Sequence, residues 1–184
     1  MLIEDGTGKG YNAKVNAKNQ LHVCSVTRSQ IAEASFTEGD AYSWSFSQAS
    51  AGGADDPILY LKNLDDKKLI LSQMWVSCSV ADVLVCKLGA VGTPAGGTAP
   101  IPTNINTSSA KLANVTTRQH TSITGLTLGT IAFRAYFTAN GISQQLLFED
   151  AFVLSKQGVW TLHITTAAAN TVTGQLMFFF QEDD

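Results

Sequence analysis

A run of alternating glycines near the N-terminus, Gly6-Thr7-Gly8-Lys9-Gly10, is the first place where the sequence could do chemistry. Glycine-rich loops hold phosphate groups through backbone N–H groups, and a nearby lysine adds positive charge. The spacing does not fit, because a phosphate loop needs four residues between its glycines and a hydroxyl residue after the lysine. A dinucleotide loop needs a preceding strand and a following helix, and neither is predicted here. We therefore predict a flexible glycine-rich arm.

Residues suited to metal binding or nucleophilic catalysis occur without the local spacing that those sites need. The histidines His22, His120 and His163 do not pair at the i+2 or i+4 spacing of a local metal site. No serine lies in a Gly-x-Ser-x-Gly turn, which presents the nucleophile of many hydrolases. We expect His163 on the polar, solvent-facing side of its strand, together with Thr161 and Thr165. The predictions are no catalytic residue, no metal and no cofactor.

Carboxylate pairs could hydrolyse sugars or hold a calcium ion. The adjacent pairs Asp55-Asp56 and Asp65-Asp66 lie in predicted turns, and neither matches a calcium-loop pattern. Aspartate is common in turns because its side chain bonds nearby backbone, so we expect solvated turns. Glu149-Asp150 lies in a predicted strand and would need a partner such as Arg134 if it were buried. A structural ion pair is the favoured interpretation there.

The composition favours one β-domain and excludes several classes of protein. Charged residues make up 15% of the 184-residue chain, against about 25% in typical soluble domains. The polar surface must then come from Ser, Thr, Asn and Gln, which suits strands better than helices. The net charge of −3 gives no basic field for nucleic acid, and no apolar run approaches the roughly 18 residues that span a bilayer. We expect no nucleic-acid or membrane partner.

The N-terminal sequence and the cysteines predict folding in a cytoplasm. Residues 1–6 lack the basic start and apolar run of a secretory signal. Cys24, Cys78 and Cys86 are odd in number and show no Cys-x-x-Cys spacing, so we expect buried free thiols.

Alternation with a period of two residues predicts an all-β fold. Tyr42, Trp44 and Phe46 alternate with serines, as in a half-buried strand. Further strands are predicted at 58–61, 69–76, 80–88, 131–137, 146–154, 159–165 and 171–181. These strands, separated by turn residues, predict an antiparallel β-sandwich or jelly roll.

Two segments and the aromatic residues need separate predictions. Residues 29–38 could form a short helix, and the Gly- and Pro-rich segment 89–109 is predicted to be a contact loop.

The aromatic residues are interpreted as core, with a sugar-stacking face as the alternative; they are Tyr42, Trp44, Phe46, Trp75, Trp160 and residues 178–180.

The first 28 residues differ from the rest of the chain. From Tyr11, the apolar residues Tyr11, Ala13, Val15 and Ala17 alternate with polar ones, which predicts a strand with one apolar face. A turn at 18–20 and an extended run at 21–26 complete a hairpin. We predict an extended arm over 1–28 and a β-sandwich body over 29–184. Such an arm cannot enclose a core, so its apolar face must lie on another surface.

The arm also carries a resemblance. Ile3-Glu4-Asp5-Gly6-Thr7-Gly8-Lys9-Gly10, Ala13-Lys14-Val15 and Asn19-Gln20-Leu21 resemble the opening of small virion proteins of tailed bacteriophages. The rest of the chain is similar only in its Ser-, Thr-, Ala- and Gly-rich strands. The resemblance implies a head decoration (cement) protein. It further implies a compact β-fold, often trimeric, with an arm that grips the capsid lattice.

The expected role is therefore structural, at the capsid surface of a virion assembled in the host cytoplasm. The partners would be the major capsid protein and further copies of the chain, in a trimer. A strand added to the capsid protein would supply main-chain hydrogen bonds for attachment. Each ion pair between an exposed lysine of the arm and an acidic residue of the capsid would add at most about 1 kcal/mol. The predicted contact residues are Gly6, Gly8, Lys9, Gly10, Tyr11, Ala13, Lys14, Val15 and Lys18. Three alternatives remain: a tail or baseplate module that binds a receptor or carbohydrate, a β-fold hydrolase, and an arm that is the first hairpin of its own domain.

Overall fold

The computed structural model describes residues 29–49, 55–127, 129–138, 141–165 and 169–182. The predicted arm, its contact residues from Gly6 to Lys18, His22 and Cys24 lie outside the described residues.

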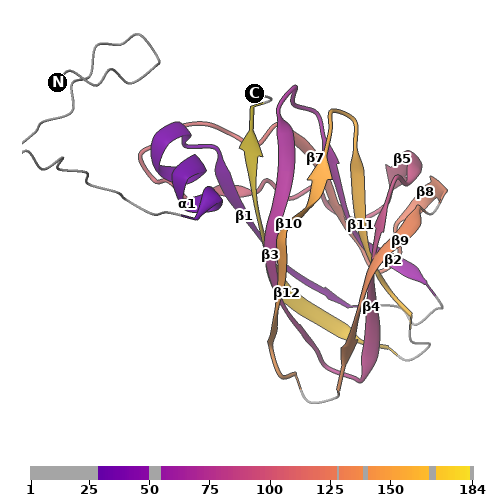
Figure 1. Ribbon diagram of the computed structural model, residues 1–184. Coiled ribbons are helices and arrows are strands. Elements are labelled where there is room, and N and C mark those ends of the chain that lie inside the picture. The colour runs from indigo at the N-terminus through magenta and orange to yellow at the C-terminus, as the bar shows by residue number, and fades with distance from the viewer. Residues whose placement is uncertain (1–28, 50–54, 128, 139–140, 166–168, 183–184) are drawn as a thin grey trace, which may run out of the picture.

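The described chain forms two antiparallel five-stranded sheets and a small two-stranded ribbon (Figure 1). The first sheet has the order β10 (Gln144–Leu154), β3 (Lys68–Cys78), β12 (Thr171–Gln181), β1 (Ala41–Ala49) and β6 (Thr103–Asn104). The second has the order β7 (Val115–Gln119), β2 (Asp56–Asn63), β11 (Val159–Ile164), β4 (Asp82–Leu88) and β9 (Thr130–Phe137). The ribbon pairs β5 (Val91–Ala95) with β8 (Thr124–Thr127).

The strand pairing is nested. Among the eight long described strands, the first pairs with the last (β1 with β12), the second with the seventh (β2 with β11), the third with the sixth (β3 with β10) and the fourth with the fifth (β4 with β9). A chain rolled up in this way, with its strands divided between two facing sheets, is a jelly roll. The predicted all-β antiparallel sandwich is confirmed, in its jelly-roll form.

The core lies between the two sheets and follows the period-two pattern of the strands. Tyr42, Trp44 and Phe46 point inward from β1 and meet side chains such as Trp160, which is 0% exposed. Residues 178–180 are apolar on both faces because β12 is a central strand: Phe178 and Phe180 enter this core, and Phe179 packs on the outer side. The core interpretation is confirmed for these aromatic residues, but Trp75 is exposed.

A short helical step covers one end of the first sheet. It consists of α1 (Gln30–Glu33), whose N-cap Ser29 accepts a hydrogen bond from Ala32, and the π-helical turn η1 (Ala34–Glu38). Gly39 ends the step with a positive φ of 66°, which suits glycine. The predicted helix at 29–38 is therefore present, with its second half wound more widely.

The predicted loop at 89–109 holds more structure than expected. It contributes β5 and β6, and the following segment forms β7 and β8, which the sequence patterns did not predict. In the ribbon, Gly92 and Gly125 both have positive φ, and a Cβ on either would collide with the backbone of the opposite strand. This close approach explains why the ribbon lacks the alternating apolar residues that predict a strand.

Candidate interaction surfaces

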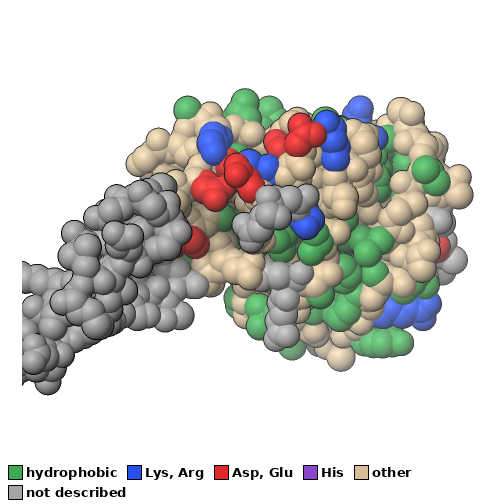
Figure 2. Space-filling model, turned by 45° about the horizontal axis from the view of Figure 1, so that its top comes forward, with side chains coloured by type: hydrophobic (Ala, Val, Ile, Leu, Met, Phe, Trp, Pro, Cys, Tyr) green, Lys and Arg blue, Asp and Glu red, His purple; other side chains and the backbone are tan. Residues whose placement is uncertain are grey.

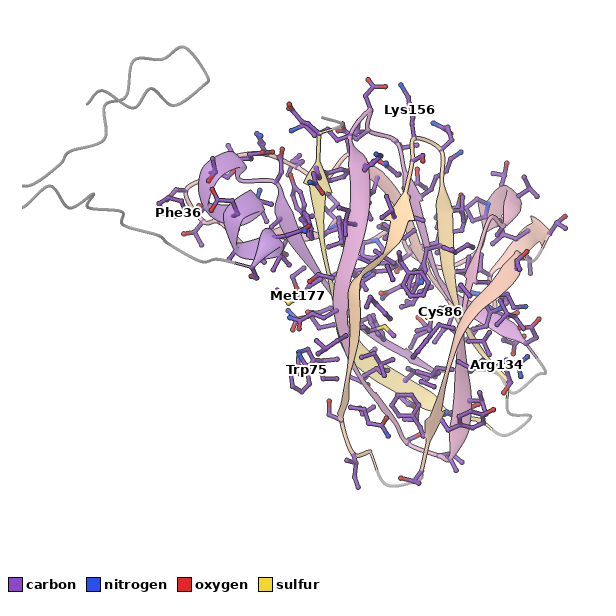
Figure 3. The ribbon with its side chains drawn as sticks, viewed as in Figure 1. Phe36, Trp75, Cys86, Arg134, Lys156 and Met177 are labelled. Carbon is purple, nitrogen blue, oxygen red and sulfur yellow. The ribbon has the colours of Figure 1, made fainter. Side chains whose placement is uncertain are left out.

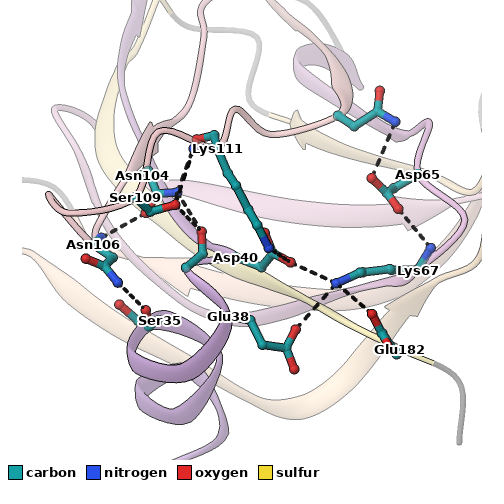
Figure 4. A network of polar contacts seen from close by, with 12 residues as sticks. Ser35, Glu38, Asp40, Asp65, Lys67, Asn104, Asn106, Ser109, Lys111 and Glu182 are labelled. Atoms are coloured by element: carbon teal, nitrogen blue, oxygen red, sulfur yellow. Dashed lines mark hydrogen bonds and ion pairs between the residues drawn. The ribbon is translucent and has the colours of Figure 1, made fainter.

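The end of the body where residue 29 begins is held together by asparagine side chains (Figure 4). Asn104 donates from Nδ2 to the Gly39 carbonyl at 2.7 Å and to the Lys111 carbonyl at 3.1 Å. Asn106 donates from Nδ2 to the Ser35 carbonyl at 2.7 Å. Segment 104–112 is thus fastened to η1. We call α1, η1 and segment 104–112, together with the neighbouring charged residues Asp40, Lys67 and Glu182, the arm pole.

A network of charges lies within the arm pole. Asp40 accepts hydrogen bonds from Lys67 at 2.9 Å and Lys111 at 3.0 Å, and Lys67 also pairs with Glu38 and Glu182. Burial alone would raise the pKa of Asp40, but the two lysine hydrogen bonds outweigh it and lower that pKa. The hydrogen bond to Asp40 raises the pKa of Lys67. The charges are therefore matched inside the protein.

The arm pole also carries exposed apolar side chains. Phe36 of η1 is 71% exposed, and in segment 104–112 Leu112 is 74% exposed and Ile105 is 36% exposed. Asp40, Lys67 and Leu112 are among the residues that line a hollow of about 260 Å³ here. In Figure 2, acidic and basic side chains lie side by side on this end of the molecule. Exposed apolar groups beside internally paired charges are typical of a protein contact surface.

The outer side of the first sheet carries a second candidate surface. We use rung for a row of side chains that lie side by side on neighbouring strands and point to the same side of the sheet. The helical step covers the top rung of this outer side, where Ile31 and Ala34 pack on Ile70 and Phe179. Three further rungs are not covered by α1 or η1, and we call them the uncharged face. They are Leu147–Gln73–Met177–Ser43, Gln145–Trp75–Gln175–Ser45 and Ser77–Thr173–Ser47. None of these side chains is charged.

Hydrogen bonds between neighbouring strands order the uncharged face. Gln145 donates to Oε1 of Gln73 at 2.7 Å, and Gln73 donates to Sδ of Met177 at 3.0 Å. Trp75 is 42% exposed and Leu147 is 60% exposed. Figure 3 shows Trp75 and Met177 on the same outer side of the sheet. The amides are thus tied to the sheet, while the two apolar side chains project from it.

A buried cluster on the second sheet has the order of groups found in a catalytic triad. Nε2 of His163 is 2.8 Å from the Thr161 hydroxyl, and its Nδ1 is 3.2 Å from both the backbone oxygen and Oδ1 of Asp55. Lys87 donates to the other carboxylate oxygen of Asp55. Hydroxyl, imidazole and carboxylate in this order can activate a nucleophile.

The same cluster is enclosed, and the prediction of a solvent-facing His163 is wrong. Thr161 and His163 are both 0% exposed, so no substrate atom reaches the hydroxyl in this conformation. Burial lowers the pKa of His163, and the Lys87 charge lowers it further against the opposing contacts of Asp55. A neutral imidazole that donates from Nδ1 and accepts at Nε2 satisfies both ring nitrogens. The arrangement supports the packing of β11, β4 and the start of β2.

The remaining candidate residues are placed as follows. The side chains of Glu149 and Asp150, for which an ion pair is predicted, lie outside the described part of the structure. Asp65 and Asp66 lie in a turn, as predicted, and Asp66 pairs with Lys156 at the surface. Asp55 also lies in a turn, as predicted, and its side chain is 38% exposed, but it is in addition paired with Lys87 and His163. No group of three or more His, Cys, Asp or Glu residues within the described ranges is arranged to hold a metal ion.

The cysteines that the structure describes are free and buried, as predicted. Burial raises the pKa of Cys78 to about 11 and that of Cys86 to about 12. At neutral pH both are therefore thiols rather than nucleophilic thiolates.

Comparison with protein-family models, with curated proteins and with solved structures finds no match. Over the described residues, no helix is long and apolar enough to cross a membrane.

Proposed function

We propose that the chain is a non-enzymatic structural protein of a tailed-phage particle. Its role is that of a head decoration, or cement, protein that binds and stabilises the capsid lattice. The observation that carries the proposal is the arm pole, which combines exposed Phe36 and Leu112 with charges already paired within the protein. The resemblance of residues 3–21 to the opening of tailed-phage virion proteins supports the same role.

Two linked contacts explain how such a protein would hold a lattice. The period-two strand 11–17 would add to a sheet edge of the capsid protein through main-chain hydrogen bonds. The arm pole would supply apolar area where the body begins, at residue 29. Because the contacts are joined by a short stretch of chain, each raises the effective concentration of the other. Lys9, Lys14 and Lys18 are among the predicted contact residues, so the part of the binding that they supply would weaken as salt is raised.

The test is co-sedimentation with empty capsids built from the major capsid protein of the same phage. The full chain is expected to pellet with the capsids. The full-length double variant Tyr11→Asp/Val15→Asp places charges on the apolar side of the arm, and we expect it to lose at least about tenfold in affinity. Leu112→Asp tests the arm pole in the same way. Tyr136→Asp is the matched control, because Tyr136 is 72% exposed on the second sheet, away from the arm pole.

The proposal fails if the full chain does not bind the capsids, or if the arm variant binds as tightly as the unmodified chain. Circular dichroism and chemical unfolding of each variant show whether it is folded. An arm variant that unfolds at the same denaturant concentration as the unmodified chain has kept the described core clusters of the body.

A receptor- or carbohydrate-binding module of the tail is the second candidate, and one observation favours it. Trp75 is exposed between Gln145 and Gln175 of the neighbouring strands, and aromatic rings with adjacent amides suit sugar rings. A saccharide that changes the Trp75 fluorescence and no longer does so in Trp75→Phe would favour this module over a decoration protein.

A further inference from the structure

We infer that the uncharged face packs against the uncharged face of a second copy of the chain. The inference rests on the proposed structural role and names a partner for it. In place of the trimer expected from the resemblance, it gives a two-fold pair in which the first sheets of two copies face each other.

Charge is the first argument for a second copy as the occupant. A two-fold contact brings the same patch of both partners together, so a charged side chain near the axis would meet its own like charge. The three rungs of the uncharged face contain Ser, Thr, Gln, Met, Leu and Trp and no charged residue. The centres of protein interfaces are depleted in Lys, Glu and Asp and enriched in Trp and Met. Two such faces can therefore meet across a two-fold axis without bringing like charges together.

Shape is the second argument. The helical step stands on the top rung of the sheet and bounds the uncharged face on that side. Stacked sheets lie about 10 Å apart, which is close to the diameter of a helix with its side chains. A partner sheet on the lower three rungs would therefore form one layer with α1 and η1. The helical step would fix how far the partner can slide along the strands.

Trp75 is the expected anchor of this contact. It lies on the middle rung, flanked by Gln145 and Gln175, and tryptophan is among the residues that contribute most to binding when buried at an interface. Four strands and three rungs cover only roughly 15 by 20 Å. Standard protein interfaces bury about 800 Å² per partner and permanent dimers bury more, so we expect a weak, reversible association with a Kd no tighter than the micromolar range.

The experiment is sedimentation velocity of the full chain between about 1 and 100 μM, without capsids. Acrylamide quenching of tryptophan fluorescence accompanies it. Trp44 and Trp160 are buried, so quenching reports mainly Trp75. We expect the mass to rise from one copy to two with concentration, and quenching to fall in parallel. Trp75→Glu and, independently, Leu147→Glu should weaken association at least about tenfold, whereas Tyr136→Glu on the second sheet should not.

Other results would overturn the inference. A chain that stays monomeric at the highest concentration has no such contact, and a trimer has a different symmetry. A pair that persists in both Trp75→Glu and Leu147→Glu uses another surface. Quenching that responds to a saccharide but not to protein concentration assigns the face to a sugar. Because no capsid is present, these outcomes leave capsid binding to be tested by itself.

Discussion

At the residue scale, the burial of His163 depends on segments other than its own strand. His163 lies on the side of its strand that also carries threonines, and this polar pattern predicted a solvent-exposed side chain. That side is buried, and the imidazole is satisfied by Thr161 and Asp55 instead of water. Alternation within one strand shows which residues share a side, but it does not show whether other segments cover that side.

The burial of His163 predicts a pH dependence of stability. Its pKa is lowered from 6.5 in the folded protein, so the unfolded chain binds the extra proton first as the pH falls. The free energy of unfolding is therefore highest above pH 6.5 and decreases below it, by up to about 1.4 kcal/mol per pH unit. Urea unfolding at a series of pH values measures this slope.

His163→Asn should remove the slope just below pH 6.5, although it lowers the stability at every pH. His120→Asn is the matched control and should keep the slope, because it leaves His163 in place. A wild-type stability that stays flat below pH 6.5, or a slope retained in His163→Asn, would contradict this view of the buried cluster.

At the scale of elements, irregularities decide which side chains reach the surface. In β3, Leu69 and Leu71 face the core, and strict alternation would turn Trp75 inward as well. A β-bulge shifts the register of β3 against β12, because Phe178 pairs with Leu71 whereas the adjacent Met177 pairs with Gln73. Beyond this bulge, Met74 and Val76 face inward and Trp75 faces outward. A bulge gives no apolar pattern of its own, so the sequence did not predict the one exposed tryptophan among the described residues.

Asn104 is one of the two asparagines that fasten segment 104–112, and its replacement should lower the stability of the arm pole. Asn104→Ala removes hydrogen bonds to two backbone carbonyls, those of Gly39 and Lys111. The Gly39 carbonyl keeps a hydrogen bond from the Ser109 hydroxyl, but the Lys111 carbonyl and the Asn106 N–H lose their Asn104 partner. Leaving such groups unpaired costs about 1–3 kcal/mol, so we expect a loss of unfolding free energy in that range. Limited proteolysis should then cut segment 104–112 faster.

Ser108→Ala is the control for this change, because only the backbone N–H of Ser108 takes part in a bond to Asn106. Equal proteolysis of the two variants would show that Asn104 does not hold the segment.

At the scale of the whole molecule, the sequence predicted the class of fold more fully than its surfaces. Strands such as β1 and β11 show clear alternation, and their number and spacing were enough for a sandwich or jelly roll. Pairing β1 with β12 joins the two ends of the body, and no local pattern contains such a contact. The arm pole joins segments from four parts of the chain, so its contacts also could not be predicted from spacing.

The two candidate surfaces are neighbours on the body. The helical step belongs to the arm pole and stands on the outer side of the first sheet, where it borders the uncharged face. A lattice protein could therefore hold the lattice with the arm pole while the adjacent sheet face meets a second copy.

Electron cryo-microscopy of empty capsids mixed with the full chain tests the central claim most directly. We predict added density for a two-sheet body at regular positions on the outer surface of the head, with the arm pole facing the lattice. Bare capsids, or density for the body only at irregular positions, would contradict the claim.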